Sequence, residues 1–317
     1  MKNIAFIFPG QGSQTTGMGL DLYNNFESAK KVYQIADTVL NKSISKICFE
    51  GPDETLKQTI NAQSAILATS IAALEALKEV SNNRIKATIT AGHSLGEYGA
   101  MYCANVMDLN TTFTAIQKRA DLMDEATKLK KGTMSAILGL DTDTIQQCLN
   151  QVQNLGVAQI ANYNDPTQTV ITGEEAAILK ANELIKEAGA RKVIPLAVSG
   201  GFHSALMQSA SEGFSEFVKN LNLNDALIPV VTNVDAKITT AKEDFRMKMP
   251  QQISSSVYWV QTIQLMLKEG VDTFIELGNG KVLAGLNRKI CPAEIKTYNV
   301  FDSQSLKDTV DGILSLV

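Results

Sequence analysis

Apolar and polar residues form two kinds of pattern along the chain, short apolar runs and longer helical patterns. Their alternation predicts the positions of the strands and helices. Short apolar or β-branched runs predict buried strands at residues 3–8, 87–91, 228–232 and 273–277. Longer segments with helical patterns lie between them, at residues 64–80, 95–105, 111–129 and 259–268, with a further helix after 278–280. We expect Asn110 to cap the helix over 111–129. This order of strands and helices predicts a large α/β domain.

The middle of the chain has a different pattern. Strands are predicted at 132–138, 157–162, 167–172 and 191–198, and helices at 141–153 and 174–188. The resulting order, β-α-β-β-α-β, is that of the ferredoxin-like split unit. We therefore expect a ferredoxin-like small domain over residues 130–198. It is inserted into an α/β-hydrolase-like domain made of residues 1–129 and 199–317.

A serine stands between two glycines at the end of a predicted strand. Gly92-His93-Ser94-Leu95-Gly96 follows the strand at 87–91 and precedes a helix. Strand, glycine-flanked serine and helix is the context of a nucleophile elbow, which exposes the serine oxygen at the top of a sheet. Ser94 is the candidate nucleophile, and the alternative is that it only caps the following helix.

Few histidines are available to act as the base for Ser94. The chain has two histidines, His93 and His203. A serine hydroxyl needs a base within hydrogen-bonding reach. His93 is adjacent to Ser94, and neighbouring side chains diverge on a tight turn. His203 is therefore the candidate base, and the alternative is a hydrogen-bonded loop histidine without a chemical role.

The glycine-rich turn after the first strand, Gly10-Gln11-Gly12, has three interpretations. A dinucleotide fingerprint fails because Thr15 stands where its third glycine belongs. A phosphate loop fails because Met18 follows Gly17 where a lysine is required. A turn that supplies an oxyanion donor facing Ser94 remains.

Composition restricts the class of protein further. The chain has 317 residues and a net charge of −4, which argues against non-specific nucleic-acid binding. We expect no apolar run to approach the length needed to cross a bilayer, and the apolar N-terminal run is too short for a signal peptide. The four cysteines have no Cys-x-x-Cys spacing, which predicts reduced thiols rather than disulfides or metal ligands: Cys48, Cys103, Cys148 and Cys291. We expect a soluble cytoplasmic protein.

Seven ordered motifs resemble one family over nearly the whole chain. They lie at 8–14, 92–98, 117–119 with Met123, 162–164, 201–204, 233–236 and 276–282. In this set and order they resemble the malonyl-CoA:acyl carrier protein transacylases of fatty acid biosynthesis. One departure is Gly278-Asn279-Gly280, where that family has glycine-proline-glycine.

The resemblance implies roles for individual residues. Ser94 is the nucleophile, His203 the general base and acid, and the N–H groups of Gln11 and Leu95 form the oxyanion hole. The remaining roles are substrate binding by Arg119, Met123, Phe202 and Asn162, and orientation of the histidine by the main-chain carbonyl of Gln252. Without the resemblance, an ion pair of Arg119 with Asp121 or Asp124 would be the favoured interpretation. Met123 lies one turn after Arg119, and a place in the core or in the wall of a pocket explains it equally well.

The implied reaction moves a malonyl group from malonyl-CoA to the phosphopantetheine thiol of acyl carrier protein through a malonyl-serine. It implies no cofactor, no nucleic-acid or membrane partner, and a monomer. Basic residues that could dock an acidic carrier protein, or be ordinary solvated side chains, are Lys128, Lys130, Lys131, Arg191 and Lys192. The alternatives are a thioesterase or esterase, a transferase serving polyketide assembly, and a catalytically inactive carrier-binding module.

Overall fold

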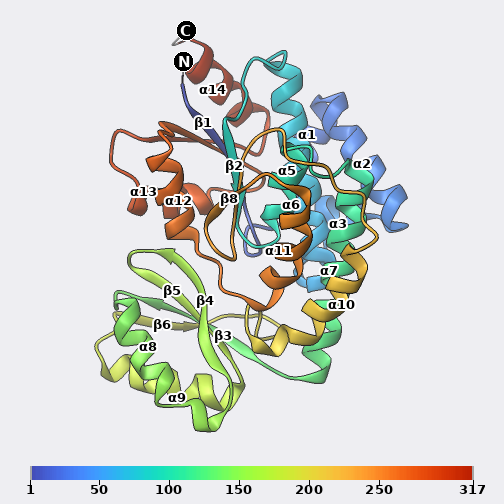
Figure 1. Cartoon of the computed structure of the whole chain (residues 1–317). Helices are drawn as coiled ribbons and strands as arrows, with labels where there is room; N and C mark the ends of the chain where they lie inside the picture. The colour runs from blue at the N-terminus through green and yellow to red at the C-terminus, as the bar shows by residue number, and fades with distance from the viewer. Residues whose placement is uncertain (1, 316–317) are drawn as a thin grey trace.

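Two separate β-sheets organise the computed structural model, which describes residues 2–315 (Figure 1). The large sheet has six strands in the order β10-β9-β1-β2-β7-β8. Neighbours are parallel except for the antiparallel pair β7–β8. The strands are β1 Ile4–Phe8, β2 Ile89–Gly92, β7 Val230–Thr232, β8 Lys237–Thr239, β9 Thr273–Leu277 and β10 Lys296–Val300.

Strand β1 lies inside this sheet and is buried on both faces. Ile4, Phe6 and Phe8 contact one hydrophobic core, whereas Ala5 and Ile7 contact a second core on the opposite face. This two-residue period explains why the strand is a continuous apolar run.

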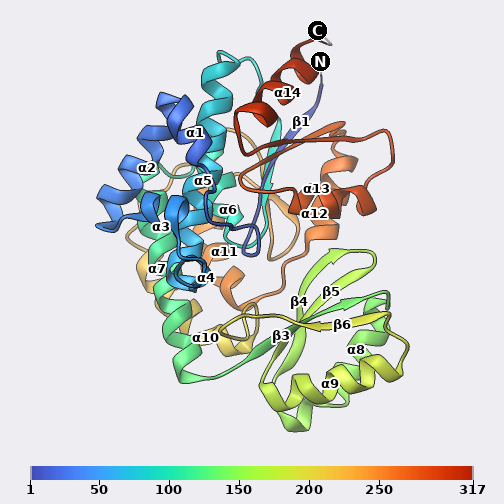
Figure 2. The same cartoon turned by 180° about the vertical axis from the view of Figure 1, so that it is seen from behind.

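Helices cover both faces of the large sheet, and Figure 2 shows the arrangement from behind. One face is covered by α12 Trp259–Lys268 and α13 Val282–Ile290. The other core includes α1 Leu20–Asn25, α2 Glu27–Leu40, α3 Ile44–Glu50, α4 Asp53–Lys57, α5 Thr59–Val80, α6 Gly96–Cys103, α7 Leu109–Leu129, α10 Gln208–Val218, α11 Lys242–Ser254 and α14 Ser303–Leu314.

Two expectations about these helices are wrong. Helix α5 is long and apolar enough, by length and composition, to cross a membrane, but 89% of its apolar window is buried inside the protein. Its apolar residues therefore serve the core, since they pack there on α2, α6 and α7. The cap of α7 is Asp108 rather than Asn110, because the Asp108 side chain accepts from Thr111 N–H at 2.7 Å.

The small sheet is antiparallel, with the order β4-β5-β3-β6. Two helices cover one face around a third core, which includes Ile137, Leu149 and Ile178. The elements are β3 Thr133–Leu138, α8 Thr142–Asn150, the 3-10 helix η1 Gln153–Leu155, β4 Ala158–Asp165, β5 Gln168–Gly173, α9 Glu175–Glu187 and β6 Lys192–Pro195. The predicted fold class, a parallel α/β sheet with a ferredoxin-like unit, is confirmed. Strand β6 is shorter than predicted and ends at Pro195.

The outer edge of β4 contacts the large unit through the segment before α12 and through α13. Residue Val257, which precedes α12, donates its N–H to Ala161 O at 2.8 Å and accepts from Tyr163 N–H at 3.0 Å. Lys289 of α13 pairs with the buried carboxylate of Asp165 at 2.8 Å. These contacts join the small sheet to the large unit near the turn that follows β2.

Candidate active site

Ser94 lies on the sharp turn between β2 and α6, with a left-handed φ of 53°. Its flanking glycines are required by close backbone approach. A Cβ on Gly92 would lie 1.9 Å from the carbonyl carbon of Gly96, and one on Gly96 would lie 2.2 Å from Phe8 O. Only glycine avoids these overlaps, so the glycines create the turn that presents the Ser94 hydroxyl.

Asn233, just after β7, holds the backbone of this turn. Its Oδ1 accepts from Ser94 N–H at 2.7 Å, and its Nδ2 donates to Gly92 O at 2.7 Å. The Asn233 N–H donates in turn to the Glu97 carboxyl at 2.6 Å. Burial raises the pKa of Glu97 to about 7. The Asn233 side chain and N–H therefore join the end of β2, Ser94 and the start of α6 in one buried network.

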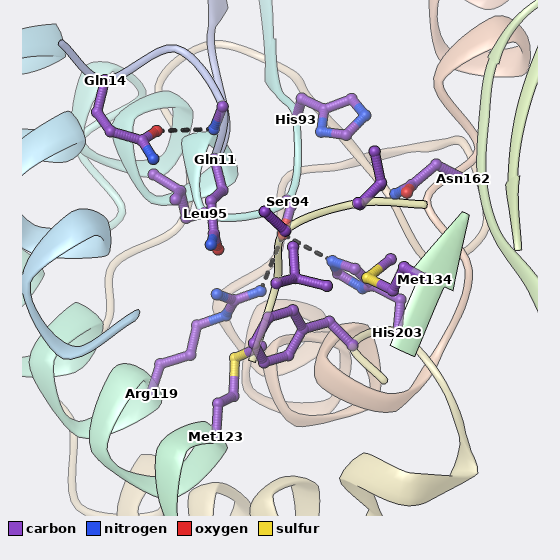
Figure 3. A pocket seen from close by; sticks show the side chains of 15 residues that line it. Gln11, Gln14, His93, Ser94, Leu95, Arg119, Met123, Met134, Asn162 and His203 are labelled. Atoms are coloured by element: carbon purple, nitrogen blue, oxygen red, sulfur yellow. Dashed lines mark hydrogen bonds between the residues drawn. The ribbon is translucent and has the colours of Figure 1, made fainter. Parts of the chain in front are cut away.

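His203 lies directly opposite the serine, although 109 positions separate them in sequence. Its Nε2 is 2.7 Å from Ser94 Oγ, as Figure 3 shows. Its Nδ1 is 3.1 Å from the main-chain oxygens of both Gln252 and Ser255. Carbonyl oxygens only accept, so Nδ1 carries the proton and the Nε2 lone pair faces Ser94.

Burial keeps this imidazole neutral. The pKa of His203 is lowered to about 3, first by burial, and further by the positive charge of Arg119 and by His93. An uncharged histidine with a free lone pair can accept the serine proton. In the usual triad a carboxylate orients the histidine, whereas here two backbone carbonyls contact it.

Arg119 of α7 is 1% exposed, and its guanidinium lies beside the Ser94 hydroxyl. Its Nη2 donates to Ser94 Oγ at 3.1 Å and to Gln252 Oε1 at 2.9 Å, and its Nη1 donates to Gln63 Oε1 at 2.5 Å. Between residues 2 and 315 no carboxylate pairs with it. Burial lowers its pKa. The site therefore holds a cation contacted by neutral acceptors.

The alternative ion pairs for Arg119 are wrong. Asp124 pairs with Lys128 at 2.7 Å, and Asp121 accepts from the Gln117 amide at 2.7 Å. Both contacts lie along α7 itself. Because Arg119 points inward, its charge is available only to the cavity and the side chains around it.

A cavity of about 310 Å³ lies over Ser94, His203 and Arg119 (Figure 3). The predicted site residues Gln11, Leu95, Met123, Asn162 and Phe202 also line it. Gln252 contributes its side chain to Arg119 and its carbonyl to His203. The remaining lining residues are Gly12, Gln14, His93, Met134, Leu196, Ala197 and Val198.

Gln11 and Leu95 line this cavity, and their backbone N–H groups have no hydrogen-bond acceptor among the residues described. They are free to donate to an oxygen in the cavity. His93 is engaged elsewhere, since its Nε2 is 2.8 Å from Asn164 Oδ1 and its ring packs on Trp259. The candidate docking residues are all exposed: Lys128, Lys130, Lys131, Arg191 and Lys192.

Sequence reasoning missed three residues at this site. Gln63 lies in α5 between Ala62 and Ser64 and gives no signal beyond being one of several polar residues in a buried helix. Asn233 belongs to one of the recognised motifs, but nothing in the sequence reveals its contacts with the serine turn. Ser255 acts through its main chain, which no side-chain pattern can indicate. Within the part of the chain described, no cluster of His, Cys, Asp and Glu could hold a metal ion.

Comparison with known proteins identifies the class. The family model for the acyl transferase domain matches residues 5–300, and the chain belongs to this family. Malonyl CoA-acyl carrier protein transacylase of Bacillus subtilis (strain 168) is 43% identical over 308 residues, which span 97% of this chain and 96% of that relative. Within the family, the chain thus groups with the malonyl-CoA:acyl carrier protein transacylases, as the motifs predict.

Solved structures agree with this assignment. A malonyl-transacylase in complex with its type II PKS acyl-carrier protein has a TM-score of 0.94 at 34% identity, covering 98% of this chain and 100% of that chain. The acyl-carrier-protein S-malonyltransferase from Burkholderia pseudomallei 1710b has a TM-score of 0.94 at 35% identity, with the same coverage. At this level of identity and coverage the likeness extends over the whole fold.

Proposed function

We propose that this protein transfers a malonyl group from malonyl-CoA to the phosphopantetheine thiol of acyl carrier protein, in fatty acid biosynthesis. The observation that carries the proposal is Arg119, a buried guanidinium that has no carboxylate partner among residues 2–315 and lies 3.1 Å from a serine hydroxyl. An acyl group with its own carboxylate is the substrate that such a site favours.

Arg119 binds the free carboxylate of the malonyl group. An unpaired anion taken out of water is costly, and a planar guanidinium can hold a carboxylate through two parallel hydrogen bonds. Gln63 and Gln252 keep the guanidinium oriented through their side-chain oxygens. The bound carboxylate also offsets the positive charge that lowers the pKa of His203, so substrate binding makes this histidine a better base.

Ser94 attacks the thioester carbonyl while its proton passes to His203 Nε2. The C–O bond to serine forms, and the carbonyl π electrons move to oxygen, giving a tetrahedral oxyanion. The free N–H groups of Gln11 and Leu95 stabilise that oxyanion. Its collapse breaks the C–S bond, and the coenzyme A sulfur leaves with the proton from His203. The product is a malonyl ester on Ser94 and a neutral histidine.

The second half-reaction reverses these roles. His203 removes the proton from the phosphopantetheine thiol, the sulfur attacks the ester, and the Ser94 oxygen leaves with the proton. Transfer of the malonyl group to the thiol must be faster than hydrolysis of the malonyl-serine ester, so water has to be excluded while the ester exists. Met123, Phe202 and Asn162 serve here as walls of the acyl cavity. Phe202 limits the α-substituent and thereby favours malonyl over methylmalonyl.

We assign the serine, histidine and arginine to a catalytic domain of residues 1–129 and 199–317, and the ferredoxin-like small domain to residues 130–198. The three cores support this division, because one of them is made only of residues from the small unit. The chemistry needs no metal or redox cofactor, since Ser94 and His203 supply nucleophile and base. We further propose a cytoplasmic monomer whose partner is acyl carrier protein.

The test is the intact mass of the protein after mixing with malonyl-CoA, followed by addition of acyl carrier protein bearing its phosphopantetheine arm. The proposal predicts a malonyl adduct that is absent in Ser94→Ala and that moves to the carrier protein. An adduct lost to water at the same rate with and without carrier protein would instead identify a hydrolase. An adduct formed by another acyl-CoA but not by malonyl-CoA would overturn the role of Arg119.

A further inference from the structure

One side chain of the small sheet contacts the backbone that carries His203. Gln159 of β4 accepts at Oε1 from Ala205 N–H at 3.1 Å, and its Nε2 donates to His203 O at 3.4 Å. The backbone of Gln159 is itself paired with Thr172 of β5. A single amide thus bridges the two peptide groups on either side of Ser204, from a strand anchored in a sheet.

The backbone at this point needs support. His203 has a φ of 56°, a left-handed conformation that residues other than glycine rarely adopt. Such a conformation persists only where the surroundings hold it. Ser204 supplies part of this support, since its Oγ donates to Gly201 O at 2.5 Å and accepts from Leu206 N–H at 3.2 Å. Gln159 supplies the contact from outside the loop.

The same strand also holds the carbonyl that orients the imidazole. Ser255 O accepts from His203 Nδ1, and the two residues after Ser255 are bound to β4. Ser256 Oγ donates to Ile160 O at 2.6 Å, and Val257 N–H donates to Ala161 O at 2.8 Å. Consecutive residues of β4 therefore contact both the main chain of His203 and the segment that accepts from its ring.

We propose that Gln159 is a positioning residue for His203, and that β4 sets the direction in which the imidazole faces Ser94. This inference rests on the proposed function of His203 as the base. Gln159 acts through His203 and not on the substrate, because it is absent from the cavity lining. Arg119 and its partners lie on α5, α7 and α11 and do not depend on it.

The test compares Gln159→Met with Gln168→Met. Methionine keeps the length of the side chain and removes both hydrogen bonds, and Gln168 is a half-buried glutamine of the adjacent strand β5. For Gln159→Met, the rate of Ser94 malonylation at saturating malonyl-CoA falls roughly 10- to 100-fold, because a misplaced base loses the aligned geometry. The KM for malonyl-CoA stays within about twofold, because the carboxylate site is intact.

The control Gln168→Met retains the rate of the unmodified protein, and both rates are measured well below the midpoint of thermal unfolding of each variant. The proposal is overturned if Gln159→Met malonylates Ser94 at the unmodified rate, or if KM rises while the rate at saturation is unchanged. Failure of the proposed function gives a different result, since the unmodified protein would then form no malonyl adduct on Ser94.

Discussion

The Arg119 guanidinium and the Ser94 hydroxyl, 25 positions apart in sequence, are hydrogen-bonded at 3.1 Å. A cation beside the nucleophile serves two purposes. In the proposed function it selects an acyl group that ends in a carboxylate, and its charge adds to burial in lowering the pKa of His203 until that carboxylate binds. Substrate selection and activation of the base are therefore linked through one side chain.

Replacing Arg119 by alanine should change substrate preference. A malonyl carboxylate left unpaired in the cavity costs about 3–5 kcal/mol, so kcat/KM for malonyl-CoA falls roughly 150- to 5,000-fold. Acetyl-CoA has no carboxylate and does not suffer this penalty. The measurement is the ratio of kcat/KM for the two thioesters in Arg119→Ala and in Lys118→Ala, a variant of the adjacent cation. An unchanged ratio in Arg119→Ala would contradict the assigned role.

The rate of Ser94 malonylation should not show the loss at low pH that protonation of an ordinary catalytic histidine causes. Because the pKa of His203 is about 3, the imidazole is already neutral throughout the range in which an ordinary histidine titrates. Single-turnover rates measured by quenched mass spectrometry are expected to vary little between roughly pH 5 and 8. A sigmoidal loss of rate centred near about pH 6.5 would show that His203 titrates as an exposed histidine.

The same histidine should make the folded state less stable in acid. Its pKa is lower in the folded protein, about 3, than in the unfolded chain, so below about pH 6.5 the unfolded state binds a proton that the folded state does not. Stability is therefore lost as the pH falls. Between pH 7 and 5 this amounts to about 2 kcal/mol.

Urea unfolding of the unmodified protein and of His203→Gln at both pH values isolates this effect. Burial raises the pKa values of Glu97 and Glu276 to about 7. These two carboxyls therefore add to the stability of the folded state as the pH falls, opposite to the effect of His203. Their contribution is common to both proteins and cancels in the difference. If the two proteins lose equal stability between pH 7 and 5, the lowered pKa of His203 is refuted.

Removing the side chain of Asn233 should affect both stability and activity. Asn233→Ala leaves the Ser94 N–H and the Gly92 carbonyl without partners inside the protein, which costs about 2–4 kcal/mol. Turnover should fall as well, because the serine turn loses its support. The exposed Asn224 donates to Asn105 O, and Asn224→Ala should change the free energy of unfolding by less than about 0.5 kcal/mol. Chemical denaturation of both variants measures the difference.

The glycines of the serine turn should not tolerate a methyl group. Gly92→Ala forces a Cβ to within 1.9 Å of the Gly96 backbone, so the turn cannot form and soluble active protein should be lost. Gly285 in α13 has open space around its Cα, and Gly285→Ala should stabilise the protein by about 0.4–1 kcal/mol. Thermal unfolding of Gly285→Ala, and the soluble yield of Gly92→Ala, check both expectations.

The sequence was informative where a local pattern is enough. Buried strands such as β1 are continuous apolar runs, and the glycine spacing around Ser94 follows from contacts within the turn and with β1. Strand β10 was not predicted, because it is an edge strand whose residues, such as Lys296 and Asn299, are polar and partly exposed. Strand β8, with three residues, is too short for a period-two pattern to be visible.

Contacts between distant segments could not be predicted from the residues alone. The environment of Arg119 depends on Gln63, which is 56 positions away and on another helix. The carbonyls of Gln252 and Ser255 contact His203 through the main chain, so the identity of their side chains gives no signal for this contact. The family resemblance supplied the candidate for one of these carbonyls, and only the fold revealed the other.

The left-handed backbone at Ser94 also restricts which nucleophiles this architecture can evolve. Threonine carries a hydroxyl of similar reactivity, but a β-branched side chain at a φ of 53° is a genuine steric outlier. Cysteine has the same unbranched shape as serine and can occupy the turn. Natural variation at this position can therefore replace serine by cysteine, which carries a thiol. It cannot replace serine by threonine, which carries a secondary alcohol.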